Sequence, residues 1–168
     1  MIDSMINSVK KFSKMYYTMR VKKACKKYEL PIKVNRKSRV TKKTYLGKNV
    51  NFNGMKISGC GQIHIGNNFH SGNECKIITQ NHNYEGEKIP YDNTYICKDV
   101  NIGDNVWLGD RVIVLGGVKI DEGAIIQAGS VVVSDIPKYA IAGGHPCKVF
   151  SYRDKEHYEK LKKEKKFH

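Results

Sequence analysis

An aliphatic side chain returns at every sixth residue in the second half of the chain, and this spacing constrains the fold more than any other feature. The first series consists of Ile102, Leu108, Val114, Ile120, Ile126 and Val132. A second series of small or aliphatic residues lies four positions further on, at Val106, Val112, Val118, Ala124, Ser130 and Ile136. Helices repeat near 3.6 residues and strands at two, so neither element alone explains a period of six.

A chain that turns after every short strand does explain this period. Six residues per edge and three edges make a triangular coil of about 18 residues, and its interior is buried only when the next coil stacks on it. Glycine and asparagine between the aliphatic positions suit the corners. We therefore predict a mainly β solenoid with two coils over residues 102–137 and about two more before them, rather than a sandwich of alternating strands.

An internal repeat extends this pattern toward the N-terminus. The segment "IHIGNNFH" at 63–70 matches "VNIGDNVW" at 100–107 through its Ile-Gly and Asn positions. Residues 79–99 between the two segments have no six-residue rhythm and are rich in polar and aromatic side chains. We interpret them as an excursion loop, and long loops on a regular framework are often functional.

The two ends of the chain carry its positive charge. Residues 1–45 hold 14 Lys and Arg against two acids, residues 46–149 hold nine against ten, and residues 150–168 hold seven against four. We expect a basic helical segment at 1–45 with its helix over 1–28, a β-helix domain at 46–149 and a basic helical tail at 150–168. The first helix suits packing on the body or on a neighbouring subunit, or a peripheral membrane contact. Nucleic-acid binding is disfavoured because the neutral core lacks interleaved aromatic residues as stacking platforms, and the charge belongs to the ends of the chain.

The cysteines and the hydropathy indicate the compartment. Five cysteines are scattered without a CxxC pair, which predicts neither a disulfide framework nor a zinc site, but mostly small buried residues in a reducing compartment. The sequence has no apolar stretch of membrane-span length and no signal-peptide pattern. We expect a cytoplasmic protein that can lie at the inner face of the membrane.

The repeat resembles the [LIV]-[GAED]-x-x-[STAV]-x hexapeptide of the left-handed β-helix acyltransferases. The segment "IGDNVWLGDRVIVLGGVKIDEGAIIQAGSVVVSDIPKYAIAGGHPCKV" is more specifically similar to the maltose, galactoside and xenobiotic O-acetyltransferase branch. The resemblance covers about residues 46–153, and it alone implies the left hand of the coil. Leu115 and Gln127 depart from the pattern, since their positions usually hold a small or acidic residue.

The resemblance implies acetyl transfer from acetyl-CoA to a hydroxyl group, without a covalent enzyme intermediate. The family pattern has its general base in the excursion loop, where this chain has His82. Glu74 can orient His82 or contact the acceptor. Asn73, Asn81 and Tyr84 are acceptor-side candidates because they lie close to these residues in the sequence.

The resemblance also implies where acetyl-CoA binds. It lies in a groove between neighbouring subunits, which implies a homotrimer with three sites. We expect no metal ion, because the scattered histidines lack spaced carboxylates or cysteines. Trp107 either borders this groove or packs on the outside of the coil, and Lys148 and Arg153 suit the phosphates. The remaining cofactor-binding candidates are Gly109, Ala128, Gly129, Val133 and Ser134.

The acceptor that we favour is a sugar, either a surface polysaccharide, its precursor or a simple glycoside. Two alternatives share the fold: an antibiotic O-acetyltransferase of the chloramphenicol or streptogramin type, and an N-acetyltransferase of a nucleotide-linked amino sugar. A noncatalytic β-helix scaffold is the alternative of a different class. The loop histidine and the small residues on the donor side argue against the scaffold.

Overall fold

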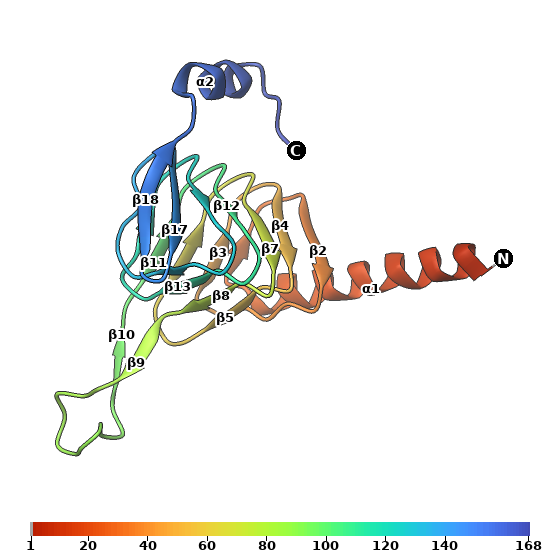
Figure 1. Ribbon diagram of the computed structural model, residues 1–168. Coiled ribbons are helices and arrows are strands. Elements are labelled where there is room, and N and C mark those ends of the chain that lie inside the picture. The colour runs from red at the N-terminus through yellow and green to blue at the C-terminus, as the bar shows by residue number, and fades with distance from the viewer. Residues whose placement is uncertain (1) are drawn as a thin grey trace.

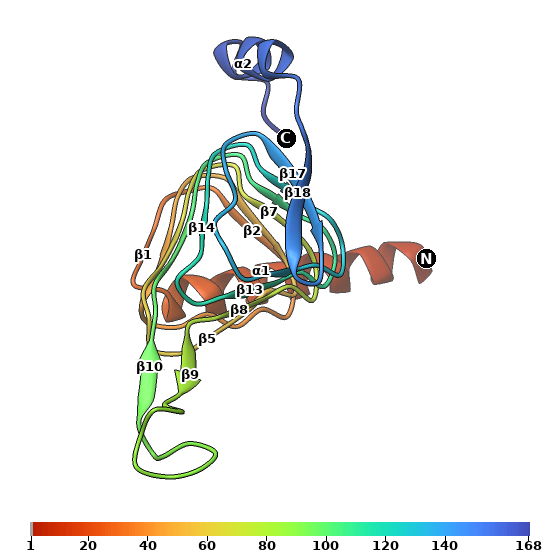
Figure 2. The same ribbon diagram turned by 60° about the vertical axis from the view of Figure 1, so that its left-hand side comes forward.

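The protein is a triangular β-solenoid with one helix at each end (Figures 1 and 2). The computed structural model describes residues 2–168, with side chains from residue 5 onward, so that Met1 and the Ile2 side chain lie outside the described part. The solenoid has about six turns, more than the four that the repeat predicts. The additional turns lie at both ends, where the six-residue rhythm is irregular.

Three parallel sheets form the faces of the triangle. Sheet A contains β1 (Lys27–Tyr28), β3 (Thr44–Leu46), β6 (Ile63–Ile65), β11 (Val100–Ile102) and β14 (Lys119–Ile120). Sheet B contains β2 (Ile32–Arg36), β4 (Val50–Asn53), β7 (His70–Asn73), β12 (Trp107–Leu108), β15 (Ile125–Ile126), β17 (Ala140–Gly144) and β18 (Cys147–Tyr152), of which β18 is antiparallel. Sheet C contains β5 (Lys56–Ser58), β8 (Lys76–Ile78), β13 (Ile113–Leu115) and β16 (Val131–Val132). The chain visits them in the order A, B, C, which defines the A–B, B–C and C–A corners.

The six-residue period is the spacing of inward-pointing side chains. Every member of the two predicted series is buried, from Ile102 and Val106 to Val132 and Ile136. Fully burying one such aliphatic side chain stabilises the fold by about 1.5–3 kcal/mol. The predicted solenoid core is therefore confirmed, and Phe52 packs edge-on against Phe69 within it, with ring centroids 6.0 Å apart.

The internal repeat marks segments that stack on each other. Ile63 pairs with Val100, and His70 pairs with Trp107, in parallel register. The two segments are 37 residues apart, rather than one coil of about 18, because the excursion is inserted between them. The excursion is a hairpin of β9 (Gln80–His82) and β10 (Tyr95–Cys97) that projects from the C–A corner (Figures 1 and 2).

Helix α1 (Ile2–Ala24) covers the open end of the first coil with its C-terminal half, and its N-terminal half extends away from the body (Figure 1). Val21 is fully buried, and the Thr18 hydroxyl accepts a hydrogen bond of 3.1 Å from the backbone N–H of Val34. The helix ends four residues before the predicted position 28, because Lys27 and Tyr28 join sheet A beside β3. The solenoid also begins before the predicted boundary at residue 46, because β1, β2 and β3 already belong to its sheets.

Helix α2 (Lys155–Lys163) lies outside the A–B corner. Asp154 caps it by accepting a hydrogen bond from the backbone N–H of His157. The Tyr158 hydroxyl accepts from Asn105 and donates to Glu122, which also pairs with Lys162. The predicted helical tail therefore starts later than residue 150, since β18 continues to residue 152. No helix in the described part of the chain is long and apolar enough to cross a membrane.

Candidate active site

The excursion hairpin holds His82 between two tyrosine rings. His82 is the last residue of β9, and its cross-strand partner is Tyr95, whose ring centroid lies 4.9 Å from the imidazole. Tyr91, from the tip of the hairpin, stacks on the imidazole at 3.9 Å and 19°. Stacking of this kind restricts a ring without removing its nitrogen atoms from solvent, and His82 is exposed. The imidazole nitrogens thus remain open to a substrate.

The other hairpin candidates do not all share the face of His82. Asn81 pairs with Ile96, and successive side chains of a strand point to opposite faces, so that Asn81 faces away from His82. Tyr84 is exposed beyond the end of β9. Tyr91 and Tyr95 are therefore the residues whose rings contact the imidazole. The sequence provides no periodic signal that the tip folds back to bring Tyr91 there.

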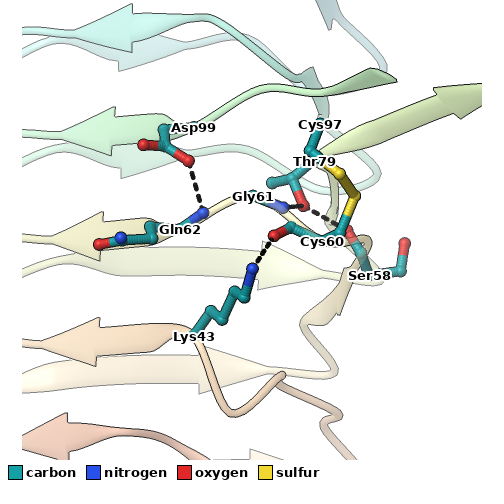
Figure 3. Close-up of a disulfide and its surroundings, with 8 residues drawn as sticks. All are labelled: Lys43, Ser58, Cys60, Gly61, Gln62, Thr79, Cys97 and Asp99. Carbon is teal, nitrogen blue, oxygen red and sulfur yellow. Dashed lines mark hydrogen bonds between the residues drawn. A yellow bond between two sulfur atoms is a disulfide. The ribbon is translucent and has the colours of Figure 1, made fainter. Parts of the chain in front are cut away.

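A disulfide between Cys60 and Cys97 ties the hairpin to the coil (Figure 3). Cys60 lies in the C–A corner, Cys97 ends β10, and their Cα atoms are 5.4 Å apart. Hydrogen bonds support the same junction: Thr79 Oγ1 donates to the Ser58 carbonyl, and the Gln62 N–H donates to Asp99.

The disulfide corrects the prediction that the chain has none. The prediction was wrong because the chain leaves the coil in the excursion and returns to it at Cys97, beside Cys60. The spacing of the two cysteines in the sequence does not reveal this return. The remaining cysteines agree with the prediction better. Cys75 and Cys147 are buried and Cys25 is half-buried, and burial raises the pKa of the Cys75 thiol to about 11.

The B–C corner holds a second set of candidates in a groove of ≈ 600 Å³, which we name the corner groove. Its lining residues are Arg36, Asn73, Glu74, Asp110, Arg111, Ala128 and Gly129. The backbone N–H and the side-chain amide of Asn73 donate to the two carboxylate oxygens of Asp110 at 2.7 and 3.0 Å. These bonds lower the pKa of Asp110. The sequence signal for Asp110 is its place after Gly109, which matches that of Asp104 after Gly103.

Glu74 lies at this corner and not at the hairpin. Its carboxylate accepts a hydrogen bond of 3.1 Å from Arg111 Nε. His82 follows β8 whereas Glu74 precedes it, so the two residues flank opposite edges of sheet C. The stretch from Glu74 to Thr79 alone spans roughly 16 Å at about 3.3 Å per residue. Contact between Glu74 and His82 therefore requires two chains.

The candidate residues on the donor side are small for different physical reasons. A Cβ on Gly109 would lie 2.6 Å from the backbone nitrogen of Ala128, so coil stacking alone requires glycine there. Gly129 has φ of +72° and open space around its missing Cβ. Ala128 and Gly129 are both exposed and leave the backbone of the corner accessible.

The remaining donor-side candidates are distributed over the rest of the surface. Val133 and Ser134 are exposed at the C–A corner, the corner from which the hairpin projects. Lys148 is exposed on β18. Trp107 and Arg153 line a separate groove of ≈ 410 Å³ beneath α2, where Arg153 Nε donates to the Gly123 carbonyl. No group of three or more His, Cys, Asp or Glu side chains that could hold a metal ion occurs among residues 5–168.

Comparison with protein families and curated sequences locates the similarity in the solenoid. Residues 92–134 match the family model of the bacterial transferase hexapeptide (six repeats). Galactoside O-acetyltransferase of Escherichia coli (strain K12) is 44% identical over 64 residues, which are 36% of this chain and 32% of that protein. A provisionally named acetyltransferase of Saccharomyces cerevisiae is 38% identical over 107 residues, or 62% of this chain and 54% of that protein. The chain spans about half or less of the length of these relatives.

Solved structures show the same fold. A galactoside acetyltransferase in complex with coenzyme A superposes with a TM-score of 0.69 at 25% identity, covering 82% of this chain and 70% of that chain. A maltose O-acetyltransferase from Clostridium difficile 630 superposes with a TM-score of 0.56 at 28% identity, covering 77% and 67%. These neighbours are left-handed β-helices, and this handedness agrees with the one that the hexapeptide resemblance implies.

Proposed function

We propose that the chain is a hexapeptide-repeat protein of the left-handed β-helix type and an acetyl-CoA-dependent O-acetyltransferase acting on a sugar hydroxyl. The observation that carries the proposal is His82, which is held between Tyr91 and Tyr95 on the only long excursion from the described coils. The relatives and structural neighbours named above are acetyltransferases.

His82 acts as the general base in this proposal. Its imidazole removes the proton from the acceptor hydroxyl as the oxygen attacks the acetyl carbonyl carbon, and the imidazolium then returns a proton to the departing thiolate. Histidine suits this role because its ordinary pKa lies near neutral pH. Tyr91 and Tyr95 fix the plane of the ring. No hydrogen bond from another described side chain orients it within one chain.

The B–C corner supplies the donor site in this proposal. Acetyl-CoA contributes an activated thioester, so that no covalent enzyme intermediate is needed when both substrates are held together. The exposed backbone at Ala128 and Gly129 allows close approach of a slender pantetheine chain. Lys148, exposed on β18, is suited to the phosphates, whereas Arg153 lines the separate groove beneath α2 and is not assigned to this site. Val133 and Ser134 at the C–A corner would contact the same arm from the chain that carries the hairpin.

The assembly that we propose is a homotrimer with shared sites. The hairpin projects from the C–A corner and the corner groove lies at the B–C corner, so one site can contain both only when two chains meet. Sheet C separates these corners. The outer face of its later coils carries the partly exposed apolar side chains Ile113, Leu115 and Val131, with Ile78 beside them on β8, whereas Lys56 and Lys76 are exposed on the first coils. Sheet A presents polar residues such as Asn101 and Lys119 at corresponding positions. Burial of the apolar face of sheet C would drive association.

We assign α1 to contact with an anionic membrane surface, which would place the enzyme near polysaccharide precursors. Phe12 is 66% exposed and Val9 is 61% exposed on the projecting half of the helix, beside Lys10, Lys11 and Lys14. Apolar side chains and cations on one helix suit an anionic interface. Flotation with phosphatidylglycerol vesicles should show binding that Phe12→Glu reduces severalfold. Equal flotation of both proteins would remove this assignment.

Steady-state kinetics of His82→Asn with acetyl-CoA and sugar acceptors test the function. We expect kcat/KM to fall by roughly 10²–10⁴-fold, which is the usual contribution of a general base. His64→Asn is the matched control, because His64 is also exposed and stacks on a tyrosine, Tyr45, with ring centroids 4.5 Å apart. Activity of His82→Asn within twofold of the wild type would remove the base from its role.

A further inference from the structure

A strongly basic groove lies between α1 and the B–C corner. It encloses ≈ 1510 Å³, and its lining includes seven Lys and Arg residues but a single acid, Glu74. Arg20 comes from α1, Arg36 ends β2, and Arg111 follows β12, so that segments far apart in the sequence contribute charge. We name this surface the basic groove.

Three of these cations form a ladder on consecutive coils. Arg39 forms a bridge with Lys56, and Lys56 pairs with Lys76 in parallel register. Adjacent strands are about 4.8 Å apart, and like charges placed opposite one another destabilise a sheet. All three side chains are exposed. The ladder thus opposes folding, and an anion bound across it would relieve the repulsion.

Neighbouring acids offset only part of the charge of the groove, and the charges of Arg36 and Arg111 contribute to the lowered pKa of Asp110 in the adjoining corner groove. Arg111 pairs with Glu74 at 3.1 Å. Within the described part of the chain, the other six cations of the groove have no ion-pair partner. Arg20 is held instead against the ring and hydroxyl of Tyr16. Several cations that converge on one concavity raise the local concentration of anions.

The composition and size of the groove indicate which anion fits. Guanidinium groups bind phosphate oxygens in pairs, and ammonium groups bind them as point charges. The volume exceeds what a phosphate ion fills, and the Tyr16 and Tyr17 side chains line its α1 side. A phosphate or pyrophosphate ester with a sugar attached matches both the charge and the space.

The basic groove continues into the corner groove, because Arg36, Glu74 and Arg111 line both. It lies on the first coils beside α1, whereas β18, with Lys148, lies at the opposite end of the solenoid (Figure 1). The cations for the phosphates of coenzyme A and the basic groove are therefore at different ends of the molecule. The acceptor-side candidates Asn73 and Glu74 line the corner groove, into which the basic groove continues.

We propose that the basic groove binds the phosphate groups of the acceptor, so that the enzyme acetylates a sugar carrying a phosphate or pyrophosphate ester. This inference rests on the proposed function for the identity of the reaction. The binding site itself rests only on the charge and shape of the groove. The two parts can therefore fail separately.

Calorimetry with inorganic pyrophosphate tests the site on protein saturated with coenzyme A, whose own phosphate contacts are then occupied. Lys56→Gln/Lys76→Gln should weaken pyrophosphate binding by about tenfold or more, since a hydrogen bond to a charged group contributes at least that factor. Lys27→Gln/Lys42→Gln removes two exposed lysines outside the groove and should change the Kd by less than twofold. Equal weakening by both pairs, or no binding by the wild type, would overturn the site.

Thermal unfolding separates a binding role from a structural one. Without ligand, Lys56→Gln/Lys76→Gln should melt at or above the wild-type temperature, because the repulsion in the ladder is relieved. Pyrophosphate should raise the Tm of the wild type and leave that of the variant unchanged. A lower Tm of the variant without ligand would show that the two lysines stabilise the fold, and would contradict the proposal.

Acceptor kinetics test the chemical class. The wild type should have at least tenfold higher kcat/KM for galactose 1-phosphate or UDP-galactose than for galactose, and Lys56→Gln/Lys76→Gln should lose this preference. An increase in KM for acetyl-CoA instead would assign the groove to the donor. Loss of binding to anionic vesicles, without loss of pyrophosphate binding, would assign these two lysines to a lipid surface. Groove-specific pyrophosphate binding without acetylation of any acceptor would retain the site and reject the proposed function.

Discussion

Two glycines at the B–C corner show how one residue type serves two purposes in this coil. Gly109 is required by the stacking of coils, since its Cβ would meet the backbone of Ala128 at 2.6 Å. Gly129 is required by its φ of +72°, while the space beside it is open. The hexapeptide pattern indicates small residues at both positions but does not distinguish a stacking requirement from a conformational one.

Alanine at these two positions should therefore have different effects on stability. Gly109→Ala forces the neighbouring coil to shift, and we expect it to lower the free energy of unfolding by about 2–3 kcal/mol. Gly129→Ala should lower the free energy of unfolding by only about 1–2 kcal/mol, because the left-handed backbone conformation is its single source of strain. Urea unfolding followed by circular dichroism measures both. A larger loss in Gly129→Ala would contradict the stacking argument.

The hairpin is the element that combines the candidate base with its attachment to the body. Its two strands pair over three residues each, and none of the residues 83–94 between them is buried. The disulfide and the hydrogen bonds at Thr79 and Asp99 hold the end of the hairpin that joins the coil. Motion of His82 relative to the coil is therefore limited chiefly by this junction.

Removal of the disulfide should loosen the hairpin more than the coils. In Cys60→Ser/Cys97→Ser, amides of β9 and β10 should exchange hydrogen faster, whereas amides of β12 and β15 keep their protection, because the coils retain their parallel ladders. Hydrogen exchange with mass spectrometry measures this difference, with Cys25→Ser as control. Uniform protection across the hairpin in both variants would show that the junction holds without the sulfur bridge.

The sequence predicts the coils well and their ends poorly. Regular positions such as Leu108 and Val114 repeat because each coil buries its inward side chains against the next coil in the same way. A period of six is therefore sufficient to predict them. The segment from Ile32 to Leu46 also forms a coil, but its spacing is irregular and hides it. The Cys60–Cys97 bridge forms because the chain returns to the coil after the excursion, and the excursion has no periodic pattern that would predict this. The placement of Glu74 and His82 at different corners follows only once the coil is wound.

At the scale of the whole molecule, the candidate residues are distributed around a triangle and do not form a compact site within one chain. The hairpin with His82, Val133 and Ser134 is at the C–A corner, and Asn73, Ala128 and Gly129 are at the B–C corner. The outer face of sheet C, which is apolar at β13 and β16, lies between them. The self-association that we propose through that face would explain both the separation and the exposed apolar residues, and each active site would then consist of residues from two chains.

Mixing of two inactive variants tests this central claim most directly. His82→Asn lacks the base, and Ala128→Trp fills the corner groove while its own hairpin stays intact. Each should be a nearly inactive trimer by sedimentation. After joint refolding in equal amounts, random assembly should give about one quarter of wild-type activity, because a site is complete when one chain supplies the base and its neighbour supplies the corner. Mixed trimers no more active than the separate variants would contradict the account.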